Sequence, residues 1–265
     1  MADSFGTAQS WNQWRSERDA ALAEPYGWFS VVGLDWLDAT PRVLDHFPGE
    51  WSASIDGNVV VAEIPVDQPL YRDGEEITGT LEIPIEPGAV DRSLRDGRGR
   101  EAELMHRFGR LGIRVRDPQS PMLASDFRVS RYKFSPKWAL RGRLLPYPEP
   151  REIIVDAASK GDQHALTAWG EAEVALPNDE VVRLAVTGDR LENASVLFYD
   201  ETNGDKTAAW RNAPIAVDGQ TVVIDFNRAA ILPAHMTPYG TCPKPPAGNV
   251  VNAKVKAGEK KVEKP

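Results

Sequence analysis

The residues of this sequence that could do chemistry are few and widely spaced. The single cysteine, Cys242, stands in the proline-rich stretch HMTPYGTCPKPP, seven residues after His235. A neighbouring base can lower the pKa of a thiol and take its proton, which would make Cys242 a nucleophile. The alternative is a small, inert side chain packed in a proline-stiffened loop, as most free cysteines are. No cysteine-enzyme signature surrounds it, so the sequence favours the packed cysteine.

A second candidate group lies in the stretch VVIDFNRA. Alternation along a strand places Asp225 and Asn227 on one face, and Arg228 follows directly. Such a group can orient an anionic or hydroxylated ligand, and Asp225 could act as a general base. It can equally form an Asx-type turn that caps the strand, and this structural role is slightly favoured. Asp200, in YDETNG, has the same two interpretations.

A third candidate is a run of arginines. Residues 92–116 contain eight arginines and no lysine in an otherwise acidic chain. The planar guanidinium suits carboxylates and phosphates. The alternative is an exposed hairpin whose charges are solvated or paired with nearby acids, namely Asp91, Asp96, Glu101 and Glu103.

Arg116 and Asp117 stand apart within this run because they lead directly into a linker. We expect the partner of Arg116 to come from the second half of the chain, with Asp225 or Asp200 as the candidates. Clefts at domain junctions are common ligand sites. The predicted ligand-binding residues are therefore Arg116, Asp117, Asp225, Asn227 and Arg228.

Metal and cofactor motifs are missing from the sequence. Its four histidines lie far apart, with no cysteine or carboxylate at ligand spacing. The P-loop, G-x-G-x-x-G and G-x-S-x-G patterns are absent as well. We expect no metal and no cofactor.

The elements that must position these residues are mostly strands. A capping-box pattern at Ser10 and Gln13 predicts one helix near the N-terminus, ended by Pro25 and Gly27. Later, turn dipeptides of the hairpin type recur between alternating or β-branched runs, at Asp56–Gly57, Asn203–Gly204 and Asp218–Gly219.

The fold class is therefore all-β, with two antiparallel segments and one N-terminal helix. We expect the helix in residues 1–27 and a first, sandwich-like β segment in 28–117. A proline-rich linker follows at 118–127. A second β segment, barrel- or sandwich-like, covers 128–255, and the lysine-rich residues 256–265 form a disordered tail.

Composition limits the partners. The chain has 265 residues and a net charge of −8, which argues against general binding of nucleic acid or anionic membranes. The N-terminal residues resemble no signal peptide, and no apolar run is long enough to span a bilayer. One cysteine fits a reducing compartment, so we expect a cytoplasmic protein. The oligomeric state stays open.

Six ordered stretches carry a resemblance to a known family. They are GWFSVVGLDWL, GIRVRDPQSP, LLPYPEPREI, DETNG, DFNRA and TPYGTCPKPPAGNVVNAKVKAGE. Together, between Trp14 and Glu259, they resemble domain of unknown function 1684, an uncharacterised bacterial and archaeal family. The sequence departs from the pattern of that family at residues 208–212 and 230–236. The resemblance implies no activity.

Two classes of function remain from the residues, with a third that needs no site. The first is a β protein that binds a small polar or anionic ligand in a pocket between the two β segments. The second is a hydrolase-type enzyme that uses Asp225 or Cys242. The third is a structural or interaction protein without a ligand site.

Overall fold

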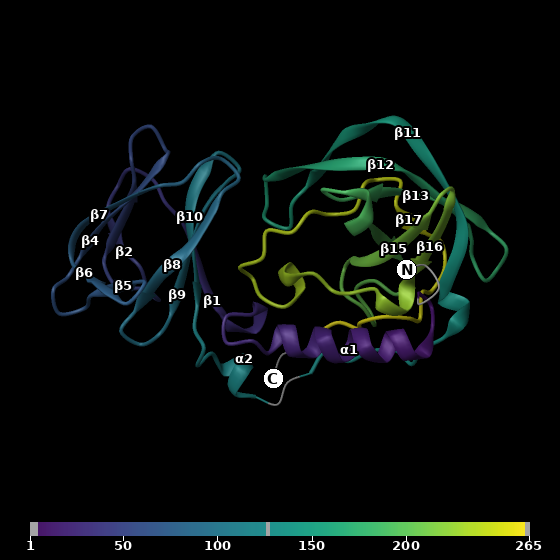
Figure 1. Cartoon of the computed structure of the whole chain (residues 1–265), viewed down its shortest axis with the longest axis horizontal. Coiled ribbons are helices and arrows are strands. Elements are labelled where there is room, and N and C mark those ends of the chain that lie inside the picture. The colour runs from purple at the N-terminus through teal and green to yellow at the C-terminus, as the bar shows by residue number, and fades with distance from the viewer. Residues whose placement is uncertain (1–4, 126–127, 263–265) are drawn as a thin grey trace. The chain divides into compact units, whose positions relative to one another are not determined.

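The chain is mostly β with one long helix near the N-terminus, as the sequence predicts (Figure 1). This computed structural model describes residues 5–125 and 128–262. The chain divides into two compact units. We call Ala21–Phe127 the sandwich unit, and Met1–Ala20 together with Arg128–Pro265 the barrel unit. Among the described residues, no helix combines the length and the apolar character needed to cross a membrane.

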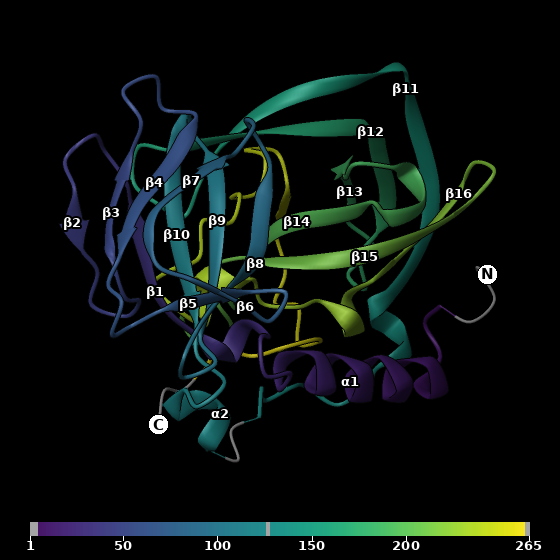
Figure 2. The same cartoon turned by 60° about the vertical axis from the view of Figure 1, so that its left-hand side comes forward.

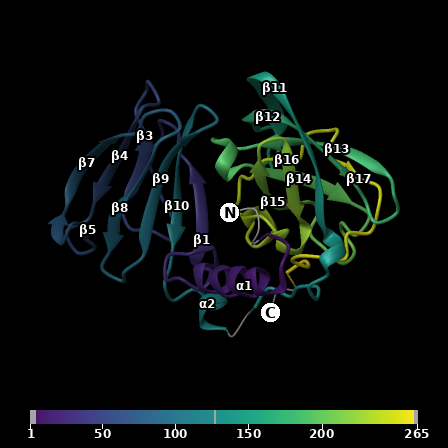
Figure 3. The same cartoon turned by 45° about the vertical axis from the view of Figure 1, so that its right-hand side comes forward.

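The sandwich unit contains two antiparallel sheets that enclose one core (Figure 3). The large indole of Trp51, on one sheet, and Leu104, on the other, have no exposed surface. The six-stranded sheet has the order β1 (Val31–Trp36), β10 (Arg110–Arg116), β9 (Glu101–Arg107), β8 (Val90–Asp96), β5 (Leu70–Arg72) and β6 (Glu75–Ile77). The four-stranded sheet has the order β2 (Arg42–Val43), β3 (Glu50–Ala53), β4 (Val59–Ile64) and β7 (Gly79–Pro84). The short helix α2 (Pro121–Ala124) follows, and the Ser120 hydroxyl caps it by accepting a hydrogen bond from the Leu123 amide.

The barrel unit is built on one strongly curved sheet that is antiparallel except for its last, short strand, which pairs in parallel (Figure 2). Its strand order is β13 (Val181–Thr187), β12 (Gln163–Ala175), β11 (Ala139–Asp156), β16 (Thr221–Asp225), β15 (Arg211–Asp218), β14 (Ser195–Asp200) and β17 (Val250–Val251). A further pairing of Thr187 with Ser195 joins β13 to β14, so the sheet closes on itself. The core inside it includes the edge-to-face pair Phe198 and Phe226, with ring centroids 4.8 Å apart.

Turn chemistry explains the hairpins. Asp56–Gly57 joins β3 to β4, Asp218–Gly219 joins β15 to β16, and the turn at Asn203–Gly204 lies between β14 and β15. The three glycines have φ of +73°, +57° and +78°, the left-handed region that glycine adopts without a steric penalty. The predicted hairpins at Asp56–Gly57 and Asp218–Gly219 are confirmed. At Asn203–Gly204 the flanking strands do pair, but the whole segment 201–210 connects them.

Helix α1 (Ala8–Leu22) belongs mainly to the barrel unit, where it lies along one end of the curved sheet (Figure 1). Its cap differs from the prediction. The capping residue is Thr7 and not Ser10. The Thr7 hydroxyl accepts a hydrogen bond from the Ser10 backbone amide, in the first turn of the helix, at 3.2 Å. Trp11 anchors the helix by donating its indole N–H to the Asn227 carbonyl at 3.0 Å.

The predicted disordered tail is wrong for its described part, residues 256–262; residues 263–265 lie outside the described chain. Val255, Ala257 and Glu259 have no exposed surface. Gly258 has φ of +74°, and a Cβ there would come within 2.4 Å of the Ala229 carbonyl oxygen, so only glycine fits. The lysine-rich composition suggested solvation, but one buried glutamate and tight backbone packing hold this segment in place.

Candidate functional site

Asp225 ends β16 and caps the 3-10 turn Phe226–Arg228. Its side chain has no exposed surface. Oδ1 accepts hydrogen bonds from the Asn227 backbone amide at 3.0 Å and from the Asn227 side chain at 3.1 Å. Oδ2 accepts one from the Gly6 amide at 3.3 Å. Burial raises the pKa of Asp225, opposed by the hydrogen bonds from Asn227. Both carboxylate oxygens of Asp225 therefore accept hydrogen bonds from the protein itself. This supports the interpretation of Asp225 as a residue that caps the turn.

Asn227 works as a clamp on the segment that precedes β11. Its side-chain oxygen accepts the Ser135 amide at 2.9 Å, and its side-chain nitrogen donates to the Ser135 carbonyl at 3.0 Å. Since its own carbonyl also binds the indole of Trp11, Asn227 fixes both α1 and the segment before Ser135. The sequence therefore singled out a residue that positions its neighbours.

Arg228 completes this turn. Its Nε lies 3.2 Å from Asp225 Oδ2, in an ion pair whose geometry is not that of a hydrogen bond. The guanidinium lies over the ring of Phe5, 4.5 Å from the centroid. The structure thus places Asp225, Asn227 and Arg228 at one turn of the barrel unit. The strand alternation expected for Asp225 and Asn227 is wrong, because the strand ends at Asp225 and Asn227 lies in the turn that follows.

Arg116 and Asp117 lie in the sandwich unit, and the expected partner of Arg116 is wrong. Arg116 binds Glu103 on the neighbouring strand, through NH2 at 2.5 Å and Nε at 3.0 Å, and not Asp225 or Asp200. Arg114 binds the other oxygen of Glu103 at 2.5 Å. Antiparallel register explains both pairs, because β10 and β9 place Glu103 directly opposite Arg114 and diagonal to Arg116 on the same face. Asp117 accepts the Gln119 amide at 2.7 Å and so caps a turn.

The four acids beside the arginine run all pair with arginines. Glu101 binds Arg92 and Arg95, and Asp96 binds Arg100 at 2.7 Å. Arg72 lies 3.9 Å from Asp91. Pairing within the sandwich unit, the alternative interpretation of this run, accounts for these acids.

Cys242 and His235 have separate surroundings. His235 packs edge-on against Trp210, with ring centroids 4.2 Å apart, and its Nε2 is buried without a hydrogen-bond partner. Burial lowers the pKa of His235 to about 4, so the ring is neutral at pH 7. Cys242 is partly buried, and its carbonyl accepts the Ala158 amide at 2.8 Å beside the bridge from Ala157 to Pro243. The proline-rich segment therefore lies beside the end of β11 and bonds to the backbone there, which is a structural role.

The sequence analysis missed a buried glutamate in the barrel unit. Glu259 accepts hydrogen bonds from Arg131 NH2 at 2.9 Å and from Arg18 Nε at 3.2 Å. Its second oxygen accepts the Ile231 amide at 2.9 Å. One carboxylate thus ties α1 and the segment after residue 127 to the C-terminal end of the chain. Sequence patterns give no signal for it, because its partners are 128 and 241 positions away.

Beside this network lies a groove between α1 and the segment that follows residue 127, both in the barrel unit. We call it the α1 groove. Its volume is about 450 Å³, within the range of small-molecule sites. It is lined by Trp11, Arg15, Ser16, Asp19, Arg128, Val129, Arg131, Tyr132 and Lys133.

The lining of the α1 groove carries mostly positive charge, although the net charge of the chain is negative. Four of its lining residues are cationic, Arg15, Arg128, Arg131 and Lys133, and one, Asp19, is acidic. Arg131 is the buried member, with 6% of its side chain exposed. It spans three partners, Asp19 at 2.8 Å, Glu259 and the Val129 carbonyl, while its Nε is buried with no hydrogen-bond partner. Its guanidinium also lies 5.4 Å from the ring centroid of Trp14.

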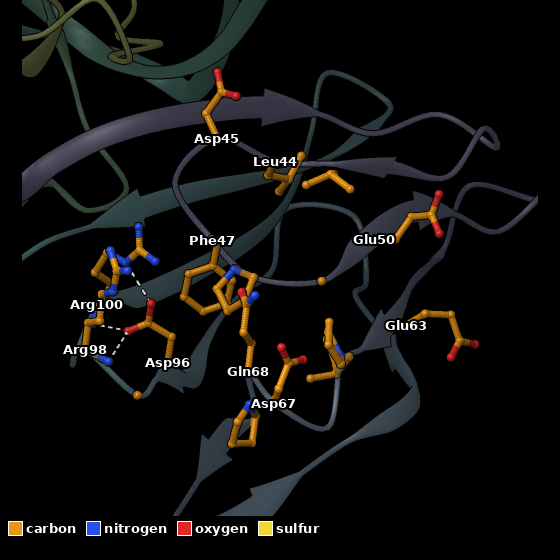
Figure 4. A pocket seen from close by; sticks show the side chains of 17 residues that line it. Leu44, Asp45, Phe47, Glu50, Glu63, Asp67, Gln68, Asp96, Arg98 and Arg100 are labelled. Carbon is orange, nitrogen blue, oxygen red and sulfur yellow. Dashed lines mark hydrogen bonds and ion pairs between the residues drawn. The ribbon is translucent and has the colours of Figure 1, made fainter.

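A larger groove, of about 1110 Å³, lies in the sandwich unit (Figure 4). Arg98 and Arg100 lie toward one side of it, and Glu50 and Glu63 lie toward the other (Figure 4). The buried acid in its lining, Asp96, already binds Arg100 and the backbone amide of Arg98. This groove therefore offers mixed charge at its rim, and its buried acid is satisfied. Within the described residues, no three histidine, cysteine, aspartate or glutamate side chains gather as metal ligands would.

Comparison with known proteins identifies a family over the second half of the chain. The family model "Protein of unknown function (DUF1684)" matches residues 126–260, a narrower span than Trp14 to Glu259. Among curated proteins, none matches this sequence. An uncharacterized protein of Haloarcula marismortui, known from a solution NMR structure, is similar with a TM-score of 0.44 and 22% sequence identity. That similarity covers 54% of this chain and 83% of the other.

Proposed function

The chain belongs to the DUF1684 family, which is described as of unknown function, and we propose from its own geometry that it binds a small anionic molecule in the α1 groove. The observation that carries this proposal is Arg131. A nine-tenths buried guanidinium lines a groove with three more cationic residues, and its Nε has no hydrogen-bond partner. A buried polar group without a partner costs free energy, which a bound ligand or water near it can offset.

The charge of the groove supports an anion. Arginine offers five N–H donors in a fixed plane, which suits the oxygens of a carboxylate or a phosphate. Arg15 and Lys133 are exposed, so each can move to meet a ligand. Arg15 also covers the Trp11 ring, 5.1 Å from its centroid, which holds one cation over the floor of the groove.

Hydrogen bonds hold the residues that line the groove in place, which lowers the entropic cost of binding a ligand. Glu259 holds Arg131, and Asn227 holds both Trp11 and the segment before Ser135. A site whose residues are already fixed loses less conformational entropy when a ligand binds. In this proposal Asp225 and Asn227 shape the site and do not contact the ligand.

The ligand we propose is a small molecule. A chain with a net charge of −8 repels long polyanions such as nucleic acid, while a short anion meets the local positive field alone. The same charge balance and the single cysteine support a cytoplasmic role. A hydrolase that uses Asp225 gains no support, because the oxygens of that side chain already bind Asn227 and Gly6.

The test is calorimetric titration of the whole chain with inorganic phosphate at constant ionic strength. We expect saturable binding that weakens at least about fivefold in Arg15→Gln and in Arg128→Gln, because each change removes one charge from the groove. Arg143→Gln is the matched control: it removes the same charge from an exposed side chain of the same unit that does not line the groove.

The proposal fails if phosphate does not bind. It also fails if Arg143→Gln weakens binding as much as the two groove variants, because the effect would then reflect overall charge and not a site.

A further inference from the structure

The α1 groove contains a carboxylate of the protein itself. Asp19, in the last turn of α1, lines the groove and forms an ion pair with Arg131 NH1 at 2.8 Å. Its side chain is 28% exposed, whereas that of Arg131 is 6% exposed. A carboxylate at this place offers Arg131 the same kind of contact that an anionic ligand would offer.

A tethered carboxylate is a strong competitor. Because Asp19 and Arg131 belong to one folded unit, the effective concentration of the aspartate at the guanidinium is on the order of millimolar or higher. A free monocarboxylate has the same charge and the same two oxygens, so it displaces Asp19 only at comparable or greater concentration. A phosphate group carries about −1.5 to −2 charges at pH 7 and three strong acceptor oxygens, so it can contact more of the groove cations at once.

We propose that Asp19 is an internal competitor that holds Arg131 until a phosphate-bearing ligand replaces it. Phosphates, with their greater charge and number of oxygens, then bind at concentrations at which monocarboxylates do not. This inference rests on the proposed function. It names the ligand class and gives Asp19 a role that anion binding alone does not require.

The surroundings of Arg131 allow this exchange. Glu259, which has no exposed surface, binds the NH2 of Arg131 at 2.9 Å, while Asp19 binds NH1. When Asp19 leaves, the bond to Glu259 still holds the guanidinium in the groove. Asp19 is already part-exposed at the helix surface, so its carboxylate can turn toward water at little cost.

The experiment compares inorganic phosphate with acetate on three proteins, by calorimetric titration at pH 7 and constant ionic strength. They are the unmodified chain, Asp19→Asn, and Glu17→Gln. The last removes the same charge from the same helix at an exposed residue outside the groove, whose carboxylate accepts a hydrogen bond from Gln13 at 2.8 Å.

We expect the unmodified chain to bind phosphate at least about tenfold more tightly than acetate. Asp19→Asn should strengthen phosphate binding by about fivefold, the upper range for loss of a part-exposed ion pair, and should bring acetate binding into the measurable range. Glu17→Gln should change phosphate binding less than about twofold.

The outcomes separate the two proposals. If phosphate binds neither the unmodified chain nor Asp19→Asn, the proposed function itself fails. If phosphate binds but Asp19→Asn equals the unmodified chain or Glu17→Gln, the function stands and the competitor role is wrong. Equal affinity of the unmodified chain for acetate and phosphate also overturns the inference.

Discussion

Arg211 NH2 donates a hydrogen bond to Asp200 Oδ1 at 2.9 Å, and neither side chain has any exposed surface. Arg211 also donates to the carbonyls of Val255 and Ala257, and Asp200 Oδ2 accepts the Val255 amide at 3.0 Å. Burial lowers the pKa of Arg211, while the charge of Asp200 opposes that change. This pair therefore joins β14 and β15 to the C-terminal segment of the chain.

Removing one partner of this pair should destabilise the barrel unit strongly. Arg211→Met leaves Asp200 as an uncompensated buried charge, which costs about 3–5 kcal/mol in the free energy of unfolding. Arg183→Met is the control, because that side chain is 59% exposed and its pair with Glu173 is worth less than about 1 kcal/mol. Urea unfolding measures both. Equal losses in the two variants would contradict the structural role of the pair.

Glu103 should make the sandwich unit sensitive to acid. Burial raises its pKa, but the charges of Arg114 and Arg116 outweigh burial, so the net pKa is lowered. A lowered carboxyl pKa stabilises the fold above the unfolded value of about 4.3 and loses that contribution as the pH falls through the folded pKa.

Glu103→Gln should therefore cost about 3–5 kcal/mol at pH 7, because two buried guanidinium groups lose their partner. The cost should shrink as the pH falls below about 4. Glu82→Gln, at an exposed position of the same unit, controls for the lost charge. Urea midpoints at pH 7 and in acid provide the measurement. A pH-independent difference between Glu103→Gln and the unmodified chain would contradict the linkage.

His235 should give the barrel unit a second pH dependence. Its folded pKa of about 4 lies below the ordinary value of 6.5, because burial disfavours the charged ring. The unfolded chain then binds more protons between these values, so stability falls as the pH falls from about 6.5 to about 4. We expect a loss of about 1–2 kcal/mol, since the ring is only partly buried. His235→Phe keeps a ring against Trp210 and should lack this loss in melts from pH 7 to pH 4. If the stability of His235→Phe fell with pH as much as that of the unmodified chain, His235 would not be the source of this pH dependence.

Glu259, which ties the C-terminal segment to Arg18 and Arg131, should be essential for the stability of the barrel unit. Glu259→Gln keeps the shape of the side chain but removes the charge that faces Arg18 and Arg131, so we expect a loss of about 3 kcal/mol or more. Glu192→Gln, at an exposed position of the same unit, should change stability by less than about 0.5 kcal/mol. Thermal melts compare the two, and similar melting temperatures would show that Glu259 is not an anchor.

Local rules predicted the fold well. The turn dipeptides located the hairpins because a glycine with positive φ is a local requirement that the sequence shows directly. The disordered tail failed for the opposite reason. Whether Glu259 is solvated or buried depends on Arg18 and Arg131, which are remote in sequence. Composition indicates that charged residues are usually exposed to solvent. It does not identify a single charged residue that is buried because remote residues pair with it.

The site was less predictable than the fold. The stretch that contains Asp225 and Asn227 was recognised from residue type, but polar residues at a strand end look the same whether they bind a ligand or cap a turn. The sequence analysis singled out Arg116 for its place before the linker and expected a partner in the second half of the chain, but its partner is Glu103 on the neighbouring strand. Register on β9 and β10 makes Glu103 the diagonal neighbour of Arg116, whose guanidinium it binds. Arg131 lines the α1 groove because it contacts Asp19 on α1.

The barrel unit takes its first helix from the start of the chain and its last anchor, Glu259, from the end. During synthesis, α1 emerges from the ribosome long before Glu259 does, and at 5–20 residues per second the delay is on the order of tens of seconds. The sandwich unit, which is continuous in sequence, can complete its core in that interval. The indole of Trp11 and the guanidinium of Arg18 have no partners until Asn227 and Glu259 have been synthesised, so α1 completes its packing only when the later part of the barrel unit follows.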